Sequence, residues 1–150
     1  MNVFTLAAAA SLLLSACGAH VVKGEPPFVR INGLEVDGNA ASLDLGVRNV
    51  NGVPLEISAM EFVISARDHE IARFDGPRQA SVIANGSETL RFELPLEAAG
   101  VEALQALQDG ETSSLPYSLE GEIESLEKVT LEFEGKGYLY PVPGRRGQFR

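Results

Sequence analysis

Strict alternation of apolar and polar residues dominates this chain of 150 residues. The clearest run is Leu43–Val47, in which leucine and valine alternate with aspartate and glycine. Similar alternation extends over residues 60–67, 89–96, 117–123 and 129–134. A period of two residues places apolar side chains on one face of an extended strand and polar side chains on the other. The pattern therefore predicts antiparallel strands, each with one face in a core and the other in water.

Asx-Gly pairs separate the alternating runs. These residues tolerate the positive φ angles that tight turns need, so each pair predicts a turn between strands. The pairs lie at Asp37-Gly38, Asn51-Gly52, Asp75-Gly76-Pro77, Asn85-Gly86 and Asp109-Gly110. The clearest hairpin is predicted around Asn85-Gly86, between residues 80–83 and 88–96. Weaker strands are expected over residues 29–36 and 137–142.

One segment, residues 97–108, departs from the alternation. Val101, Leu104 and Leu107 follow helical spacing, and Asp109-Gly110 supplies a C-terminal stop. The apolar stripe is narrow, so we expect a helix that lies across the end or edge of a sheet. Together these elements predict an all-β fold with one short helix: an immunoglobulin-like or fibronectin-III-like antiparallel β-sandwich of about seven to eight strands.

The composition narrows the classes of partner. The formal net charge of −9 argues against binding to nucleic acid, whose phosphates attract basic proteins. The chain has one cysteine, so no disulfide framework forms within a monomer and stability must come from packing. Glu120, Glu122 and Glu124 share an outward strand face, whereas a general acid needs a secluded site to shift its pKa.

Residues suited to catalysis or metal binding are few. The two histidines are His20 and His69, and Asp68-His69-Glu70 predicts a solvated turn between strands. A metal site would need more nitrogen or sulfur ligands, or a cluster of oxygen ligands with loop spacing. The chain contains no nucleophile elbow, phosphate loop or dinucleotide motif. We therefore expect no enzymatic activity, no metal, no cofactor and no small-molecule substrate.

Two features suggest contact with a partner. Tyr117, Tyr138 and Tyr140 are a candidate partner surface; the alternative is that their rings cover the edge of the sandwich. Residues 143–150 form a basic C-terminal tail that contains three arginines. The tail is interpreted either as a frayed end in water or as a segment that touches phosphate head groups or a protein partner.

The N-terminal segment ends in Leu14-Ser15-Ala16-Cys17, which resembles the lipobox of bacterial lipoproteins. Residues 3–16 are apolar and uncharged, but too few to span a bilayer core of about 30 Å. The resemblance implies that residues 1–16 are a lipoprotein signal peptide, that Cys17 is acylated, and that residues 17–27 form a lipidated tether. It implies a place in the bacterial cell envelope, and the absence of aspartate after the cysteine favours the outer membrane, facing the periplasm. The alternative is an uncleaved hydrophobic N-terminus with a buried cysteine.

The stretch from Leu43 to Leu55 resembles the strand and turn of type 2 late-embryogenesis-abundant (LEA) proteins, the LEA14-like or WHy domain. Asn49 and Asn51 match the two asparagines of the Asn-Pro-Asn turn, Val50 replaces its proline, and Pro54 matches the proline that follows. Further matches follow in order at residues 62–64, 82–87, 117–121 and 133–140, so the resemblance covers residues 28–142. Asparagine side chains hydrogen-bond neighbouring backbone groups, so we expect Asn49, Asn51 and Pro54 to form a structural turn.

The lipobox and the family resemblance together imply a non-catalytic, membrane-anchored LEA14-like lipoprotein that acts in stress protection against desiccation, cold or osmotic shock. The expected contacts are the membrane, through the lipid at Cys17, and client proteins. The alternative function is an envelope adaptor or accessory lipoprotein that binds a protein partner through a sheet edge.

Overall fold

The computed structural model describes residues 24–150. Eight strands form two antiparallel four-stranded sheets: sheet A has the order β5-β2-β1-β8 and sheet B has the order β4-β3-β6-β7. The elements are β1 (Phe28–Asp37), β2 (Ala40–Arg48), β3 (Leu55–Ala66), β4 (His69–Val82), β5 (Ser87–Pro95), α1 (Ala98–Gln108), β6 (Leu115–Ser125), β7 (Thr130–Leu139) and β8 (Gln148–Phe149). The predicted all-β sandwich with one short helix is confirmed.

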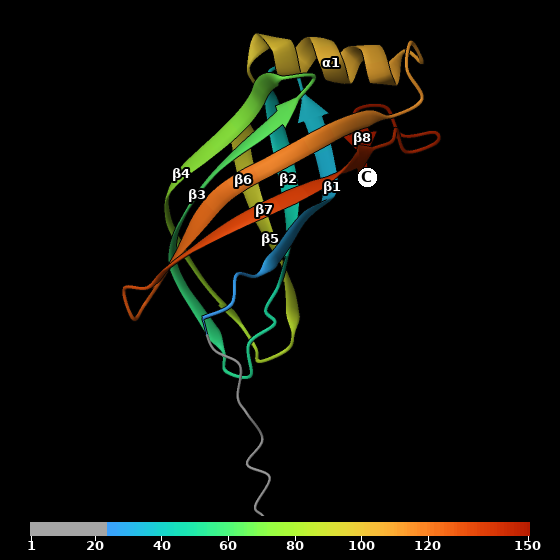
Figure 1. The fold of residues 1–150 in the computed structure, drawn as a ribbon. Helices are drawn as coiled ribbons and strands as arrows, with labels where there is room; N and C mark the ends of the chain where they lie inside the picture. Colours follow the sequence, from blue (N-terminus) through green and yellow to red (C-terminus); the bar gives the residue numbers. More distant parts are fainter. Residues whose placement is uncertain (1–23) are drawn as a thin grey trace, which may run out of the picture.

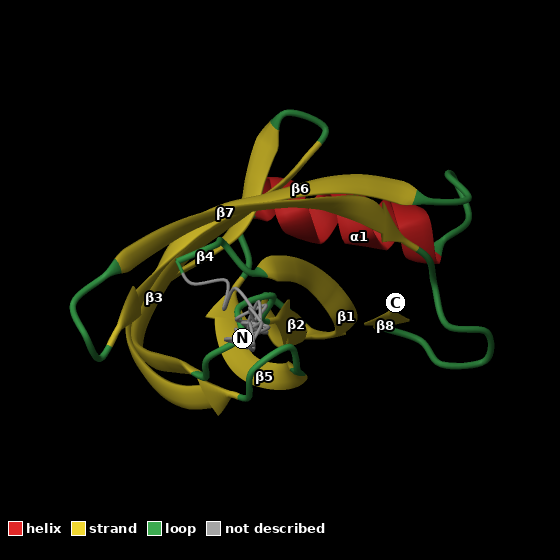
Figure 2. Cartoon of the chain, turned by 60° about the horizontal axis from the view of Figure 1, so that its bottom comes forward, coloured by secondary structure: helices red, strands yellow, loops and turns green. Residues whose placement is uncertain are grey.

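The two sheets pack face to face, and α1 lies across one end of the sandwich (Figure 1). Seen from the opposite end, sheet B curves over sheet A (Figure 2). We call this opposite end the proximal end, because residues 24–27 enter the domain there; the loops 49–54 and 83–86 and the turn 126–129 lie at the strand ends on this side. No helix within the described residues is long and apolar enough to cross a membrane.

The predicted alternation accounts for the core. Leu43, Leu45 and Val47 of β2 are fully buried, whereas the residues between them are partly exposed. In sheet B the same holds for Leu119 and Ile123 of β6. Because each strand alternates in this way, the sandwich has an apolar interior and two polar outer faces.

Aromatic side chains close one corner of the sandwich, where β4 and β5 meet. The Phe74 ring lies 5.6 Å from Phe62 and 4.7 Å from Phe92, measured between centroids. The Arg78 guanidinium carbon lies 4.8 Å from the centroid of Phe92, a cation–π arrangement. Bulky rings thus fill the space between the sheets at this corner.

Glycines close the opposite corner, where β1 and β7 meet. A Cβ atom at Gly135 would overlap the carbonyl oxygen of Val29, so the two backbones lie in direct contact there. The Tyr117 hydroxyl accepts a hydrogen bond from the Ile31 backbone N–H at 3.1 Å, which joins sheet B to sheet A. Gly137 leaves room for that hydroxyl, because a Cβ there would lie 2.7 Å from it.

The hairpin predicted around Asn85-Gly86 is wrong. A turn does form: Asn85 has φ 55° and the Gly86 N–H donates to the Ile83 carbonyl at 3.0 Å. However, β4 pairs with β3 in sheet B and β5 pairs with β2 in sheet A. The turn therefore carries the chain from one sheet to the other. Turn residues specify a local reversal of the chain, not which strand becomes the neighbour.

The turn predicted at Asp75-Gly76-Pro77 is also wrong, because these residues lie inside β4. β4 is an edge strand of sheet B. Proline has no backbone N–H, and an edge strand tolerates it because the side without a neighbouring strand needs no donor. A register shift between Ile57 and Ala59 of β3 accommodates the irregular segment. Of the strand expected over residues 137–142, residues 137–139 are the end of β7, and Pro141 forms only an isolated bridge with Phe149.

Both ends of the domain extend beyond the predicted boundaries of residues 28 and 142. Pro27 is buried, so the tether predicted over residues 17–27 already packs on the sandwich at its C-terminal end. The tail predicted over residues 143–150 folds back, and β8 pairs with Leu34 and Glu35 of β1. Phe149 is only 3% exposed. Burial of this ring, together with the backbone pairing, explains why the tail is ordered despite its charge.

Candidate functional site

The residues predicted to be functional do not come together in one site. Cys17 lies outside the described residues. Asn49, Asn51 and Pro54 lie in the loop between β2 and β3 at the proximal end. Tyr138 and Tyr140 lie at the other end of β7.

Asn49 is the centre of the loop at residues 49–54, which we call the asparagine loop. Its side chain is fully buried and its amide nitrogen donates to the carbonyl oxygens of Val53 at 2.8 Å and of Val82 and Ile83 at 3.2 Å. Its side-chain oxygen accepts from the backbone N–H of Asn51 at 2.9 Å. One amide therefore bonds backbone groups of the asparagine loop and of the chain where β4 ends and the loop 83–86 begins.

Asn51 attaches the incoming chain to the asparagine loop. Its side-chain oxygen accepts from the Glu25 N–H, and its side-chain nitrogen donates to the Glu25 carbonyl, both at 2.9 Å. The side chain thus makes the same two hydrogen bonds that a neighbouring strand would make. This contact holds Glu25 at the proximal end.

The three tyrosines do not form one surface, which corrects the prediction for Tyr117. Tyr117 is only 7% exposed, and its hydroxyl bonds inside the sandwich as described above. It shares the inward face of β6 with Leu119 and Ile123, so its alternation already indicated the core. Tyr138 and Tyr140 are exposed, with ring centroids 6.5 Å apart.

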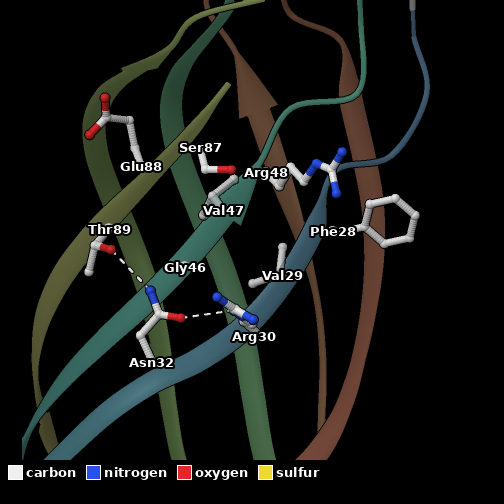
Figure 3. A pocket seen from close by; sticks show the side chains of 10 residues that line it. All are labelled: Phe28, Val29, Arg30, Asn32, Gly46, Val47, Arg48, Ser87, Glu88 and Thr89. Carbon is white, nitrogen blue, oxygen red and sulfur yellow. Dashed lines mark hydrogen bonds between the residues drawn. The ribbon is translucent and has the colours of Figure 1, made fainter. Parts of the chain in front are cut away.

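A hollow of about 430 Å³ lies on the outer face of sheet A near the proximal end. Gly46 forms its floor, and Asn32 lies across this glycine, donating to Thr89 at 3.0 Å and accepting from the Arg30 Nε at 3.0 Å (Figure 3). Phe28 and Arg48, which are register partners, stand at its edge. The hollow is an open depression on the surface, lined by both polar and apolar residues.

A second hollow, of about 490 Å³, lies between the asparagine loop and the turn 126–129. Val53, Pro54, Leu126 and Val129 are among its lining residues, and Gly24 lies on its edge. We call it the proximal hollow. The alternation over residues 129–134 predicted Val129 on the inward face of a strand, but Val129 lies in the turn before β7 and is exposed, as is Leu126.

A row of carboxylates crosses the outer face of sheet B. Cross-strand register places Asp75 opposite Glu61, Glu61 opposite Glu122, and Glu122 opposite Glu132. All four residues are exposed. The sequence indicated the outward position of Glu122, but the row depends on the register of four strands. We call these four residues the carboxylate row.

One ion pair flanks the row. The Arg73 guanidinium donates to the Glu70 carboxylate at 2.6 and 2.8 Å, and these hydrogen bonds hold the pKa of Glu70 below its ordinary value of 4.5. Because the pKa of Glu70 is lower in the folded protein, the ion pair stabilises the fold at pH values above the ordinary pKa. This stabilisation is lost as the pH falls through the lowered pKa of the folded state. Both groups are in water, so the contribution is small.

Replacing Glu122 by threonine is expected to raise the free energy of unfolding by about 0.5–1 kcal/mol at low salt, because like charges directly opposite each other destabilise a sheet. The gain should shrink in about 1 M NaCl, where the Debye length is only about 3 Å. Urea unfolding at the two salt concentrations measures it. Glu88→Thr on β5, opposite Val47, is the matched control and should show no such salt dependence.

Within residues 24–150, no three His, Cys, Asp or Glu side chains are arranged so that they could hold a metal ion. His69 is exposed at the start of β4. The described surface therefore offers open hollows and charged faces, which suit binding and hydration.

The sequence model of the LEA_2 family, described as late embryogenesis abundant protein, matches residues 44–137. The chain belongs to the LEA_2 family. The match begins in β2 and ends in β7, so it includes the asparagine loop and the carboxylate row of this LEA_2 domain. Strand β8 lies outside it.

A solved structure shares the fold of this LEA_2 domain. The solution structure of At1g01470 from Arabidopsis thaliana matches with a TM-score of 0.57 and 15% identity, covering 95% of this chain and 97% of that chain. A crystal structure of a protein from Archaeoglobus fulgidus matches with a TM-score of 0.46 and 17% identity, covering 76% of this chain and 95% of that chain. No curated protein matches the chain significantly.

Proposed function

We propose that this LEA_2 protein is a non-catalytic lipoprotein of the bacterial cell envelope that protects other envelope components during drying, freezing or osmotic stress. One observation carries the proposal: in this LEA_2 domain Asn51 holds Glu25, which lies only eight residues after Cys17 of the lipobox-like sequence. An acyl chain on Cys17 would keep this domain close to a membrane surface. The outer membrane, facing the periplasm, is the proposed location.

The charged outer faces of the sandwich support a protective role. Carboxylates hold water strongly, and a net negative surface keeps protein molecules apart. The carboxylate row places four such groups side by side on sheet B. A domain with this face, held at the membrane, would keep a hydrated layer between neighbouring client proteins as water is lost.

The anchor is tested with the Cys17→Ser variant. We expect the wild-type protein to stay in the membrane fraction and to have a mature mass that begins at an acylated Cys17. The variant lacks the thiol that carries the lipid, so it should be soluble. An unmodified Cys17 in the mature protein, or a variant that remains in the membrane, would contradict the anchor.

The stress role is tested with a deletion strain. Its survival after drying, freezing and osmotic shock should fall, and the wild-type gene should restore it. The Cys17→Ser gene should restore less, because the domain would no longer be held at the membrane. Unchanged survival of the deletion strain under all three stresses would refute the protective role.

The adaptor function has one structural observation in its favour. β7 is the last strand of sheet B, and the exposed rings of Tyr138 and Tyr140 lie at its end. A protein partner could add to this edge and cover the rings. Pull-down from solubilised membranes with wild type and a Tyr138→Ser, Tyr140→Ser variant tests it: a stoichiometric partner lost in the variant supports the adaptor.

A further inference from the structure

Exposed apolar side chains concentrate at the proximal end. Of the six large hydrophobic residues exposed in the described chain, four lie there: Phe28 at 66%, Ile83 at 65%, Leu126 at 60% and Val129 at 46%. Single exposed apolar residues are common on soluble proteins, but a group at one end marks a contact surface. The end of the sandwich near α1 is capped by a helix instead.

The proximal hollow gives this group a shape. The hollow lies between the asparagine loop and the turn 126–129, and the Leu126 N–H donates to the Glu56 carbonyl at 2.9 Å, which fixes the turn against β3. Val53, Pro54, Leu126 and Val129 present apolar atoms around it. Its chemistry therefore suits hydrocarbon.

The length of the preceding chain limits how far this surface can be from a lipid anchor. Gly24, which lines the proximal hollow, is only seven residue steps after Cys17 in the sequence. Fully extended, they reach about 25 Å at most. Because Asn51 also holds Glu25, an anchor at Cys17 stays within this reach of the proximal end as long as that contact is made.

The charges near the hollow favour one kind of lipid surface. Glu56 and Glu127 line it, and Lys128 is neutralised by Glu124 at 2.8 Å. Anionic head groups would repel these acids, so attraction must come from apolar contact. A zwitterionic bilayer fits this combination.

From these observations we infer that the proximal end docks on the zwitterionic surface of the bilayer in which Cys17 is anchored, with Leu126 and Val129 in the interfacial layer and the proximal hollow facing the lipid. This inference rests on the proposed lipid anchor. The exposed tips of a sandwich are well placed for such contact, because the buried core stays intact when they enter the interface. The docked domain would hold its carboxylate row at a set distance from the membrane.

The test uses tryptophan, which the native chain lacks. The acylated full-length Leu126→Trp protein is placed in phosphatidylcholine vesicles whose acyl chains carry bromine, a quencher of tryptophan. Interfacial side chains lie at the head-group–acyl boundary, so we expect about half of the fluorescence to be lost relative to plain vesicles. Tyr140→Trp, at the other end of the domain, is the control and should keep its fluorescence. Leu126 and Tyr140 are both exposed, so neither change disturbs the core.

The outcomes separate the docking from the anchor. If the protein floats with the vesicles through Cys17 but tryptophan at position 126 is not quenched, the docking is refuted and the anchor stands. If flotation does not depend on Cys17, or no acyl chain is present, the anchor fails and the docking fails with it. The third outcome is that the emission of tryptophan at position 126 is already shielded from water without lipid and does not change when vesicles are added. This would mean that the chain's own N-terminal segment occupies the hollow, and it would also refute the docking.

Discussion

Replacing Asn49 by aspartate is expected to lower the free energy of unfolding by about 3 kcal/mol or more at pH 7. The side-chain nitrogen of Asn49 donates to three carbonyl oxygens, on Val53, Val82 and Ile83. A carboxylate has the same shape but no N–H, so it would face these oxygens with a negative charge. The site is fully buried, and water cannot relieve the repulsion.

The loss should depend on pH. Burial and the facing carbonyl groups would raise the pKa of the introduced carboxyl above its value in the unfolded chain. A raised pKa means that folding favours the protonated form, so the loss is smallest below about pH 4 and grows as the pH rises through the raised pKa. Urea unfolding of variant and wild type at several pH values measures the difference.

Asn85→Asp is the matched control for this experiment. Asn85 is exposed in a turn with φ 55°, a conformation that asparagine and aspartate both tolerate. We expect a change of less than about 0.5 kcal/mol, as for most surface substitutions. Equal losses for the two variants would mean that the Asn49 hydrogen bonds do not stabilise the fold.

Replacing Gly135 by alanine is expected to lower the free energy of unfolding by about 1–3 kcal/mol, the range for overpacked sites. The added Cβ would overlap the carbonyl oxygen of Val29. That oxygen belongs to the backbone of β1, so it cannot rotate away as a side chain would. In the variant, β1 must move away from β7, which separates the two sheets at the corner formed by Gly135 and Gly137.

Gly76→Ala is the matched control for the corner. Gly76 also lies in a strand of sheet B, but a Cβ there meets only the Phe74 ring, at 3.8 Å, which is ordinary contact. Alanine restricts the unfolded chain more than glycine does, so this change should be neutral or slightly stabilising. A Gly135→Ala protein as stable as Gly76→Ala would show that the two sheets separate there at little cost.

Side-chain alternation predicted where strands lie but not which strands meet. Period two is visible within a single strand, so the inward residues of β2 and β6 were identified from sequence. Pairing involves residues far apart in the chain, and no local signal distinguishes a hairpin from a crossing between sheets. This is why the turn at Asn85 was predicted correctly as a turn but the neighbours of β4 and β5 were not.

The site residues divide in the same way. The local part of the roles of Asn49 and Asn51 was predictable, because asparagine side chains often bond nearby backbone, and the bonds within residues 49–53 lie at the predicted bend. The bonds from these side chains to Val82, Ile83 and Glu25 join segments far apart in the chain, and no local signal predicts them. The carboxylate row has no local signal in the sequence. Asp75 and Glu132 lie at its two ends, and only the pairing of the two strands between them places them in one row. Phe149 was missed because a two-residue strand is too short to show a period.

The pairing of β1 with β8 joins the first strand of the domain to the last. The ring of Phe149 can enter the core only after residue 149 has been synthesised. Until then, the edge of β1 beside Leu34 has no neighbouring strand, and sheet A lacks β8. If the chain is exported from its N-terminus onward, as proposed above, sheet A would be completed only after β8 has also crossed the membrane. Chains that end before residue 148 would lack this last step, which leaves them more accessible to proteases than the full-length protein.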